Sequence, residues 1–113
     1  MNKLIADKWC LALRSGEYDQ CKQTLENTGA FCCLGVLCKL AEKENINVKF
    51  NLPLSSELLG GSLDDQTAVL NWADLKHGNA LNDYTDASLA QINDSGADFK
   101  HIADVIEQTW EQL

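Results

Sequence analysis

The sequence predicts a mainly α-helical fold: a small helical bundle around one buried central helix over residues 31–43, with at most a minor β-hairpin beside it. The stretch Phe31–Cys38 reads Phe-Cys-Cys-Leu-Gly-Val-Leu-Cys and covers every side of a helix with apolar groups, so no side is left for water. Residues 2–15 and 95–113 repeat apolar side chains at helical spacing. A chain of this length closes one core without a disulfide or metal, which predicts a single domain over residues 1–113.

The first helix is predicted over residues 2–15. Leu4 and Leu11 widen its apolar stripe beyond a single seam, and Trp9 is expected to anchor the helix to the core. Gly16 stands where a left-handed C-terminal cap is needed. Four residues form the stripe itself: Ile5, Trp9, Ala12 and Leu13.

The segment between the first helix and the buried helix has a mixed pattern. Residues 17–30 fit either irregular structure or a short hairpin that turns at Asn27-Thr28-Gly29. Thr28 or Gly29 is then expected to introduce the buried helix, which runs to about Asn45. Residues 46–50 alternate apolar and polar side chains, which predicts a short strand.

The second half of the chain predicts three further helices separated by polar loops. After a turn-rich linker, a helix capped by Ser62 or Asp65 runs through Leu75, and residues 76–85 form a polar loop. Asp86 is expected to cap a helix of two turns. The last helix begins at about residue 95 and shows the clearest amphipathic pattern in the chain, with apolar side chains at Phe99, Ile102, Ile106, Trp110 and Leu113.

The charge is distributed unevenly along the chain. Residues 1–50 hold seven basic and six acidic residues, a net of +1, whereas residues 51–113 hold two basic and eleven acidic residues, a net of −9. The resulting total of −8 repels nucleic acid and anionic membranes and attracts basic surfaces. The competing interpretation is that the acidic residues only keep a small protein soluble.

The location expected for the protein is the cytoplasm. The N-terminus has a charge where a signal peptide would be apolar, and no apolar run approaches the roughly 20 residues that a membrane span needs. An odd number of cysteines without a signal peptide favours reduced thiols. Three of the five cysteines, Cys32, Cys33 and Cys38, lie in the apolar run and are expected to pack as small hydrophobic groups.

No catalytic residue, metal ligand or cofactor is predicted. A zinc site needs four ligands, commonly at Cys-x-x-Cys spacing, and Cys33 and Cys38 point about 140° apart on a helix of about 3.6 residues per turn. A thiol nucleophile would need Cys21 or Cys38 beside a histidine, and only the fold could bring such partners together. The sequence therefore favours a binding protein over an enzyme.

Four segments together resemble a family of small uncharacterised proteins encoded by phages and prophages. They are Trp9-x-x-Ala-Leu-Arg-Ser-Gly-x-Tyr18, Phe31-Cys-Cys-Leu-Gly-Val-Leu-Cys-x-Leu40, Trp72-Ala-Asp-Leu75 and Leu89-Ala-x-Ile-Asn-Asp-x-Gly-x-x-Phe-x-x-Ile-Ala103. The resemblance brings no established chemistry with it. It implies a small accessory protein that inhibits or modulates host machinery, including CRISPR and other defence systems.

Two functional hypotheses follow. The first is a monomeric or homodimeric protein that docks an acidic face on a host protein with a basic surface and binds neither nucleic acid nor membrane. The second is a protein that sequesters a small molecule or signalling nucleotide in a pocket near Trp9, Trp72 and Tyr84. The acidic residues expected to contact the partner are Asp64, Asp65, Asp83, Asp86, Asp94, Asp98, Glu107 and Glu111.

Overall fold

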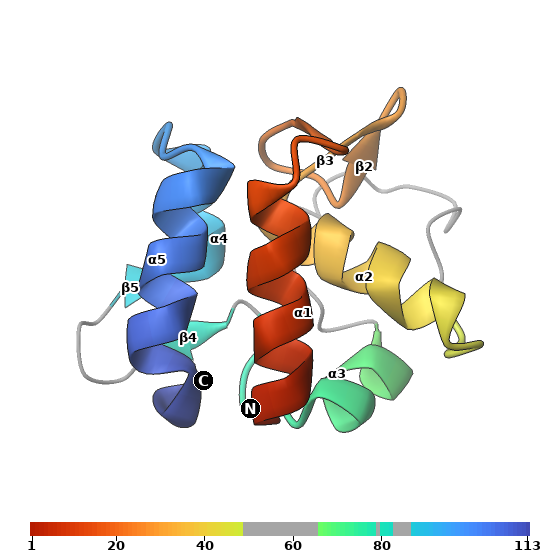
Figure 1. The fold of residues 1–113 in the computed structure, drawn as a ribbon. Coiled ribbons are helices and arrows are strands. Elements are labelled where there is room, and N and C mark those ends of the chain that lie inside the picture. Colours follow the sequence, from red (N-terminus) through yellow and green to blue (C-terminus); the bar gives the residue numbers. More distant parts are fainter. Residues whose placement is uncertain (49–65, 79, 83–86) are drawn as a thin grey trace.

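A computed structural model describes residues 1–48, 66–78, 80–82 and 87–113 of the chain. Within these residues the fold is mainly helical with short strands, which confirms the predicted class (Figure 1). The five α-helices are α1 (Lys3–Arg14), α2 (Cys33–Lys43), α3 (Thr67–Ala73), α4 (Leu89–Asp94) and α5 (Phe99–Thr109), and a short 3₁₀ helix, η1 (Trp110–Gln112), follows α5.

A three-stranded sheet is formed by the segment that connects α1 to α2 in the sequence. Its strands are β1 (Asp19–Gln20), β2 (Glu26–Asn27) and β3 (Ala30–Phe31), and β3 is central, parallel to β1 and antiparallel to β2. The hairpin alternative for residues 17–30 is therefore confirmed. Its turn places Thr28 and Gly29 at φ 51° and 84°, and two central residues with positive φ are what a tight hairpin requires.

A second, two-stranded sheet was not predicted. The strand β4 (Leu81–Asn82) pairs in antiparallel fashion with β5 (Ala87–Ser88). The sequence indicated only a polar loop over residues 76–85 and a helix beginning at Asp86. The helix α4 instead begins at Leu89, and Ser88 closes a capping box with Gln91. Asp86 lies outside the described residues.

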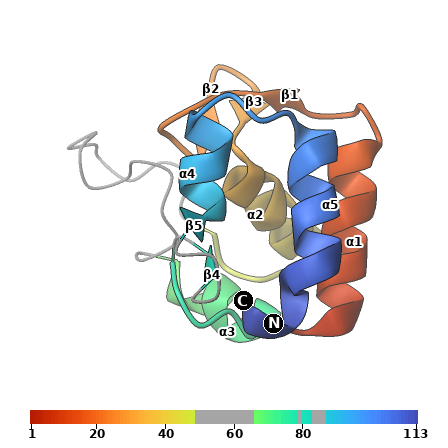
Figure 2. The same ribbon diagram turned by 90° about the vertical axis from the view of Figure 1, so that its left-hand side faces the viewer.

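The helix α2 occupies the centre of the molecule, as expected (Figure 2). It lies between a layer formed by α1 and α5 on one side and α4 on the other, and every residue from Cys33 to Cys38 is buried. It begins two residues later than predicted because Phe31 belongs to β3. Cys32, rather than Thr28 or Gly29, is the N-cap, and its Sγ accepts a hydrogen bond from the Gly35 amide at 3.4 Å.

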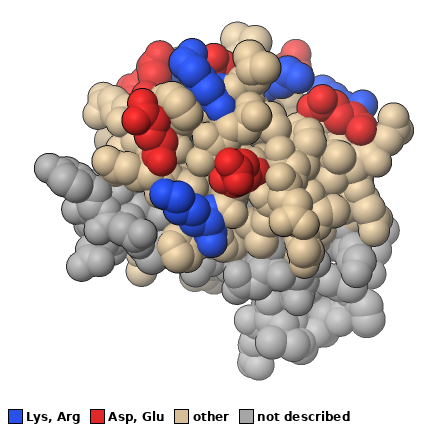
Figure 3. Space-filling view, turned by 90° about the horizontal axis from the view of Figure 1, so that it is seen from below, with Lys and Arg blue, Asp and Glu red and all other residues tan. Residues whose placement is uncertain are grey.

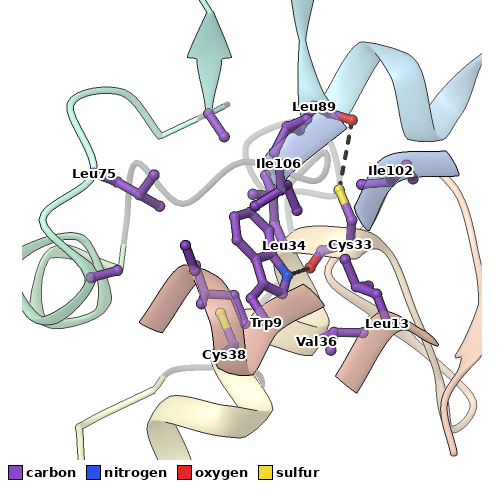
Figure 4. Packing of buried hydrophobic residues seen from close by; sticks show 14 of the residues in the cluster. Trp9, Leu13, Cys33, Leu34, Val36, Cys38, Leu75, Leu89, Ile102 and Ile106 are labelled. Atoms are coloured by element: carbon purple, nitrogen blue, oxygen red, sulfur yellow. Dashed lines mark hydrogen bonds between the residues drawn. The ribbon is translucent and has the colours of Figure 1, made fainter. Parts of the chain in front are cut away.

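The core is built around Trp9, which is fully buried against α2 (Figure 4). Its indole Nε1 donates a hydrogen bond to the carbonyl oxygen of Cys33 at 2.8 Å. This bond satisfies the one polar atom of the largest buried side chain and fixes α1 to the first turn of α2. The predicted anchoring role of Trp9 is confirmed.

The predicted strand over residues 46–50 is wrong for residues 46–48, and residues 49 and 50 lie outside the described part of the chain. Asn45 adopts φ 62° and its amide donates to Glu42 O, while the Ile46 amide donates to Ala41 O. These two bonds form the left-handed termination that closes many helices. The apolar side chains of residues 46 and 48 are partly buried against the core.

Two other helix boundaries differ from the prediction. The helix α3 ends at Ala73 because Asp74 adopts a left-handed conformation with φ 57°. Its N-cap is Gln66, and the caps expected at Ser62 and Asp65 lie outside the described residues. The helix α5 begins at Phe99 because residues 95–98 first close α4 and then supply the N-cap.

Candidate functional site

The thiols of the apolar run are internal, as the sequence predicted. Cys32 is 1% exposed and both Cys33 and Cys38 are fully buried. The Cys33 Sγ donates to the carbonyl oxygen of Leu89 at 3.6 Å (Figure 4). Burial raises the pKa of Cys32 to about 11 and the pKa values of Cys33 and Cys38 well above their usual value. All three therefore stay protonated at neutral pH, which leaves them unreactive.

The other two cysteines lie outside this run. Cys10 is buried on α1 and its Sγ donates to Ala103 O at 3.4 Å, and burial raises its pKa to about 11. Cys21 is half-buried after β1, and burial raises its pKa too. In the part of the chain that the structure describes, no group of three or more His, Cys, Asp or Glu side chains could hold a metal ion. The same part has no helix long and apolar enough to cross a membrane.

A buried polar cluster at Asn93 was missed by the sequence analysis. The Asn93 side chain is fully buried, and its Oδ1 accepts from Gln20 Nε2 at 2.8 Å and from the Cys33 amide at 3.2 Å. Its Nδ2 donates to the Cys21 carbonyl oxygen at 2.9 Å and to Asp94 Oδ1 at 3.2 Å. One asparagine therefore joins α4 to β1 and to the start of α2, which is a structural role.

The acidic residues expected to bind a partner lie in different places. Asp64, Asp65, Asp83 and Asp86 are outside the described residues. Asp94 is half-buried and accepts a hydrogen bond from the Gln23 amide at 2.8 Å. Asp98 caps α5 by accepting from the His101 amide at 2.8 Å. Asp94 therefore connects α4 to the segment between β1 and β2, and Asp98 stabilises the start of α5.

The exposed face of α5 carries the remaining predicted carboxylates. Glu107 accepts from Arg14 on α1 at 2.8 Å, and Arg14 also donates to Asp104 at 2.7 Å. Glu111 is exposed, and Lys100 lies one turn before Asp104 on the same helix. Two basic residues thus accompany three acidic ones on this face, and on the face seen in Figure 3 charges of both signs are likewise interspersed.

Of the residues near which a pocket was predicted, Trp9 and Trp72 lie in the described part of the chain. Trp9 has no exposed area, so a ligand at the surface could not touch it. Trp72 is half-buried against the core on α3, and Tyr84 lies outside the described residues. The burial of Trp9 agrees with its role as an anchor of the core, and the pocket itself stays a prediction.

A groove with a cavity volume of about 240 Å³ lies between α1 and α2, and we call it the α1–α2 groove. Its walls come from the outer side of α1, the residues that follow α1, and the last two turns of α2. The lining combines apolar surface with two lysines and one glutamate. The lining residues are Lys8, Leu11, Ala12, Ser15, Glu17, Tyr18, Leu40 and Lys43.

Tyr18 and Lys43 are held together in this groove. The Lys43 Nζ donates to the Tyr18 hydroxyl at 3.3 Å and lies 5.9 Å from the centre of its ring. The Tyr18 ring packs edge-on against Phe31 at 5.8 Å, which fixes the ring on the sheet. Across the groove, Lys8 Nζ lies 3.6 Å from a carboxylate oxygen of Glu44, with both side chains largely in solvent.

Leu11 projects from α1 at the edge of the groove and is 72% exposed, and Leu4, about two turns earlier on the same helix, is 73% exposed. Both leucines belong to the widened apolar stripe that the sequence predicts for this helix. They lie outside the core because α5 and α2 cover the side of α1 that carries Trp9 and Leu13, and no described segment covers the opposite side. An apolar side chain is thus left in water at the edge of the groove.

A family model described as a domain of unknown function, DUF8296, matches residues 1–110. The chain belongs to the DUF8296 family. The match spans nearly the whole chain, so the five α-helices, the three-stranded sheet and both walls of the groove fall inside the family domain. No curated protein and no solved structure matches the chain.

Proposed function

We propose that this protein is a small accessory protein that binds and modulates a bacterial host protein, and that it docks through the α1–α2 groove. The observation that carries the proposal is an apolar groove with an exposed leucine at its edge. The resemblance to small phage and prophage proteins supports a host protein as the target, including a component of a defence system. The cytoplasm is the compartment in which such a target would be met.

The size of the groove favours docking of a protein over binding of a nucleotide. Pockets for drug-sized ligands occupy about 300–1,000 Å³, whereas this groove holds about 240 Å³. A space of that size accepts one or two side chains, and protein interfaces commonly bind through a few anchor residues that fill such pockets. Sequestering of a signalling nucleotide remains the alternative function, and stabilisation by a nucleotide in a thermal-shift panel would support it.

The acidic face predicted from the sequence is the alternative contact surface. Its support is the exposed stripe of Asp104, Glu107 and Glu111 on α5, which suits a basic partner. Arg14 pairs with two of these three carboxylates, which lowers the net charge of the stripe from −3 to −2. The groove therefore has the stronger support as the main contact, with the net charge of −8 acting at longer range.

A matched pair of leucine variants tests the proposal. Leu11 and Leu4 have the same exposure on the same helix, but only Leu11 lines the groove. Partners captured from a bacterial lysate by the wild type, Leu11→Ser and Leu4→Ser are quantified by mass spectrometry, and purified candidates are then titrated. We expect one partner to bind Leu11→Ser at least tenfold more weakly, a loss of about 1.4 kcal/mol, and Leu4→Ser almost normally.

Two results would contradict the proposal. Equal binding of the partner by all three proteins would exclude the groove as the contact. Loss of binding on neutralising Glu107 and Glu111, together with normal binding by Leu11→Ser, would move the contact to the acidic face. Because both leucines are exposed, neither substitution removes core packing, and matching unfolding curves would confirm that the variants fold.

A further inference from the structure

We infer that the α1–α2 groove selects an acidic amphipathic segment of its partner, with an apolar anchor side chain beside a carboxylate. This inference rests on the proposed function and specifies the chemistry of the docked segment. It differs from what the net charge of the chain suggests, because a protein with net charge −8 attracts basic segments at long range.

The apolar part of the recognition comes from Leu11, Ala12 and Leu40. Ala12 and Leu40 are half-buried and form the inner surface between the two helices, while Leu11 extends the apolar surface outward. An apolar side chain inserted here removes exposed area of Leu11 and of the groove from water at once. An amphipathic helix that lies along a groove inserts the apolar side chains of one side into it.

The charged part comes from the two lysines of the groove. Lys43 has a cation–π contact and a hydroxyl acceptor in Tyr18, but it forms no ion pair with a carboxylate among the residues that the structure describes. Its contact with Tyr18 restricts the ammonium to one wall of the groove. A carboxylate of the partner would therefore meet a cation that is already positioned.

Lys8 supplies the second cation, and its present partner is easily replaced. Lys8 lies 3.6 Å from Glu44 with side chains that are 56% and 43% exposed, and exposed pairs of this kind contribute little. Glu17 is the one acidic residue of the lining, and it follows α1 at the opposite end of the groove from Lys8. The lining thus has a net charge of +1, and Lys43 is its one cation without an ion pair among the described residues.

Three synthetic peptides of about twelve residues provide the test. They share leucines at i, i+4 and i+7, the spacing of a helix that docks in a groove, and their remaining positions are all Glu, all Gln or all Lys. Binding of each labelled peptide to the full chain is measured by fluorescence anisotropy, and amide shifts in NMR spectra locate the site. Non-specific attraction to a chain of charge −8 favours the Lys peptide, so a preference for the Glu peptide requires the local lysines.

We expect the Glu peptide to bind more tightly than the Gln peptide and to shift the amides of Leu11, Leu40 and Lys43. Lys43→Gln should weaken the Glu peptide by up to about fivefold, the upper range for one exposed ion pair, and leave the Gln peptide unchanged. Lys3→Gln makes the same change of net charge on an exposed lysine outside the groove, and we expect it to leave both peptides unchanged.

Tighter binding of the Lys peptide, or amide shifts elsewhere on the chain, would overturn the inference. Equal effects of Lys43→Gln and Lys3→Gln would overturn it as well, because they would show a response to total charge only. These outcomes are distinguishable from failure of the proposed function. If Leu11→Ser still abolishes binding of the host partner while the peptides show no preference for Glu, the groove is the docking site and only its charge selectivity is wrong.

Discussion

Replacing Gly35 with alanine should destabilise this protein, although the same change inside an ordinary helix is stabilising. A Cβ at Gly35 would lie 1.9 Å from the carbonyl oxygen of Leu25 and 2.9 Å from its carbonyl carbon. These are backbone atoms, so no rotation of a side chain relieves the clash. Overpacking of this kind costs about 1–3 kcal/mol, and a contact this short falls at the upper end. The gain from removing a helical glycine is about 0.5–1 kcal/mol, so a net loss of about 2 kcal/mol is expected.

Urea unfolding followed by tryptophan fluorescence, to which the buried Trp9 contributes, measures this loss as a lower midpoint at an unchanged m-value. Gly35→Ser should lose still more, because its side chain is larger. The control compares Gln108→Ala with Gln108→Gly on the exposed side of α5, where alanine should be the more stable by about 1 kcal/mol. If Gly35→Ala proved as stable as the wild type or more stable, the close approach of α2 to Leu25 would not exist.

Two further predictions concern the interior. Asn93→Leu should cost about 1–3 kcal/mol in urea unfolding, because it leaves the buried Cys33 amide without its acceptor and removes the amide that donates to the Cys21 carbonyl oxygen. The thiols should make the fold sensitive to alkali. Cys10 and Cys32 have pKa values raised from 9.0 to about 11, so the unfolded chain ionises first. Their contribution to stability is therefore intact below pH 9 and is lost as the pH rises through 11, which unfolding curves across this range would show.

The elements that the sequence predicted best are those whose pattern allows only one environment. An eight-residue stretch without a polar side chain fits only the interior, so the central position of α2 followed directly from Phe31–Cys38. The start of the helix did not follow, because Phe31 has its backbone hydrogen bonds in the sheet and Cys32 then becomes the cap. Helix boundaries depend on such long-range pairing, which periodicity within one segment does not contain.

The groove and the polar cluster were missed for a related reason. Leu4 and Leu11 belong to the apolar side of α1 by spacing alone, and only the positions of α2 and α5 decide which part of that side is covered. Asn93 resembles a surface residue at the end of a short helix, yet its partner Gln20 is 73 residues away. The sequence shows the type of each residue and its local pattern. It does not show which distant residue becomes its neighbour in the fold, and that neighbour decides whether the residue is buried, exposed or hydrogen-bonded.

Net charge and local charge lead to opposite expectations for the partner, and binding kinetics separate them. The net charge of −8 acts over about a Debye length, roughly 8–10 Å in physiological salt, and mainly sets the association rate. The lysines of the groove act at contact and mainly set the dissociation rate. A host protein with a basic surface around an acidic amphipathic segment would satisfy both. For such a partner, added salt should slow association of the wild type, whereas Lys43→Gln should speed dissociation and leave that salt dependence nearly unchanged.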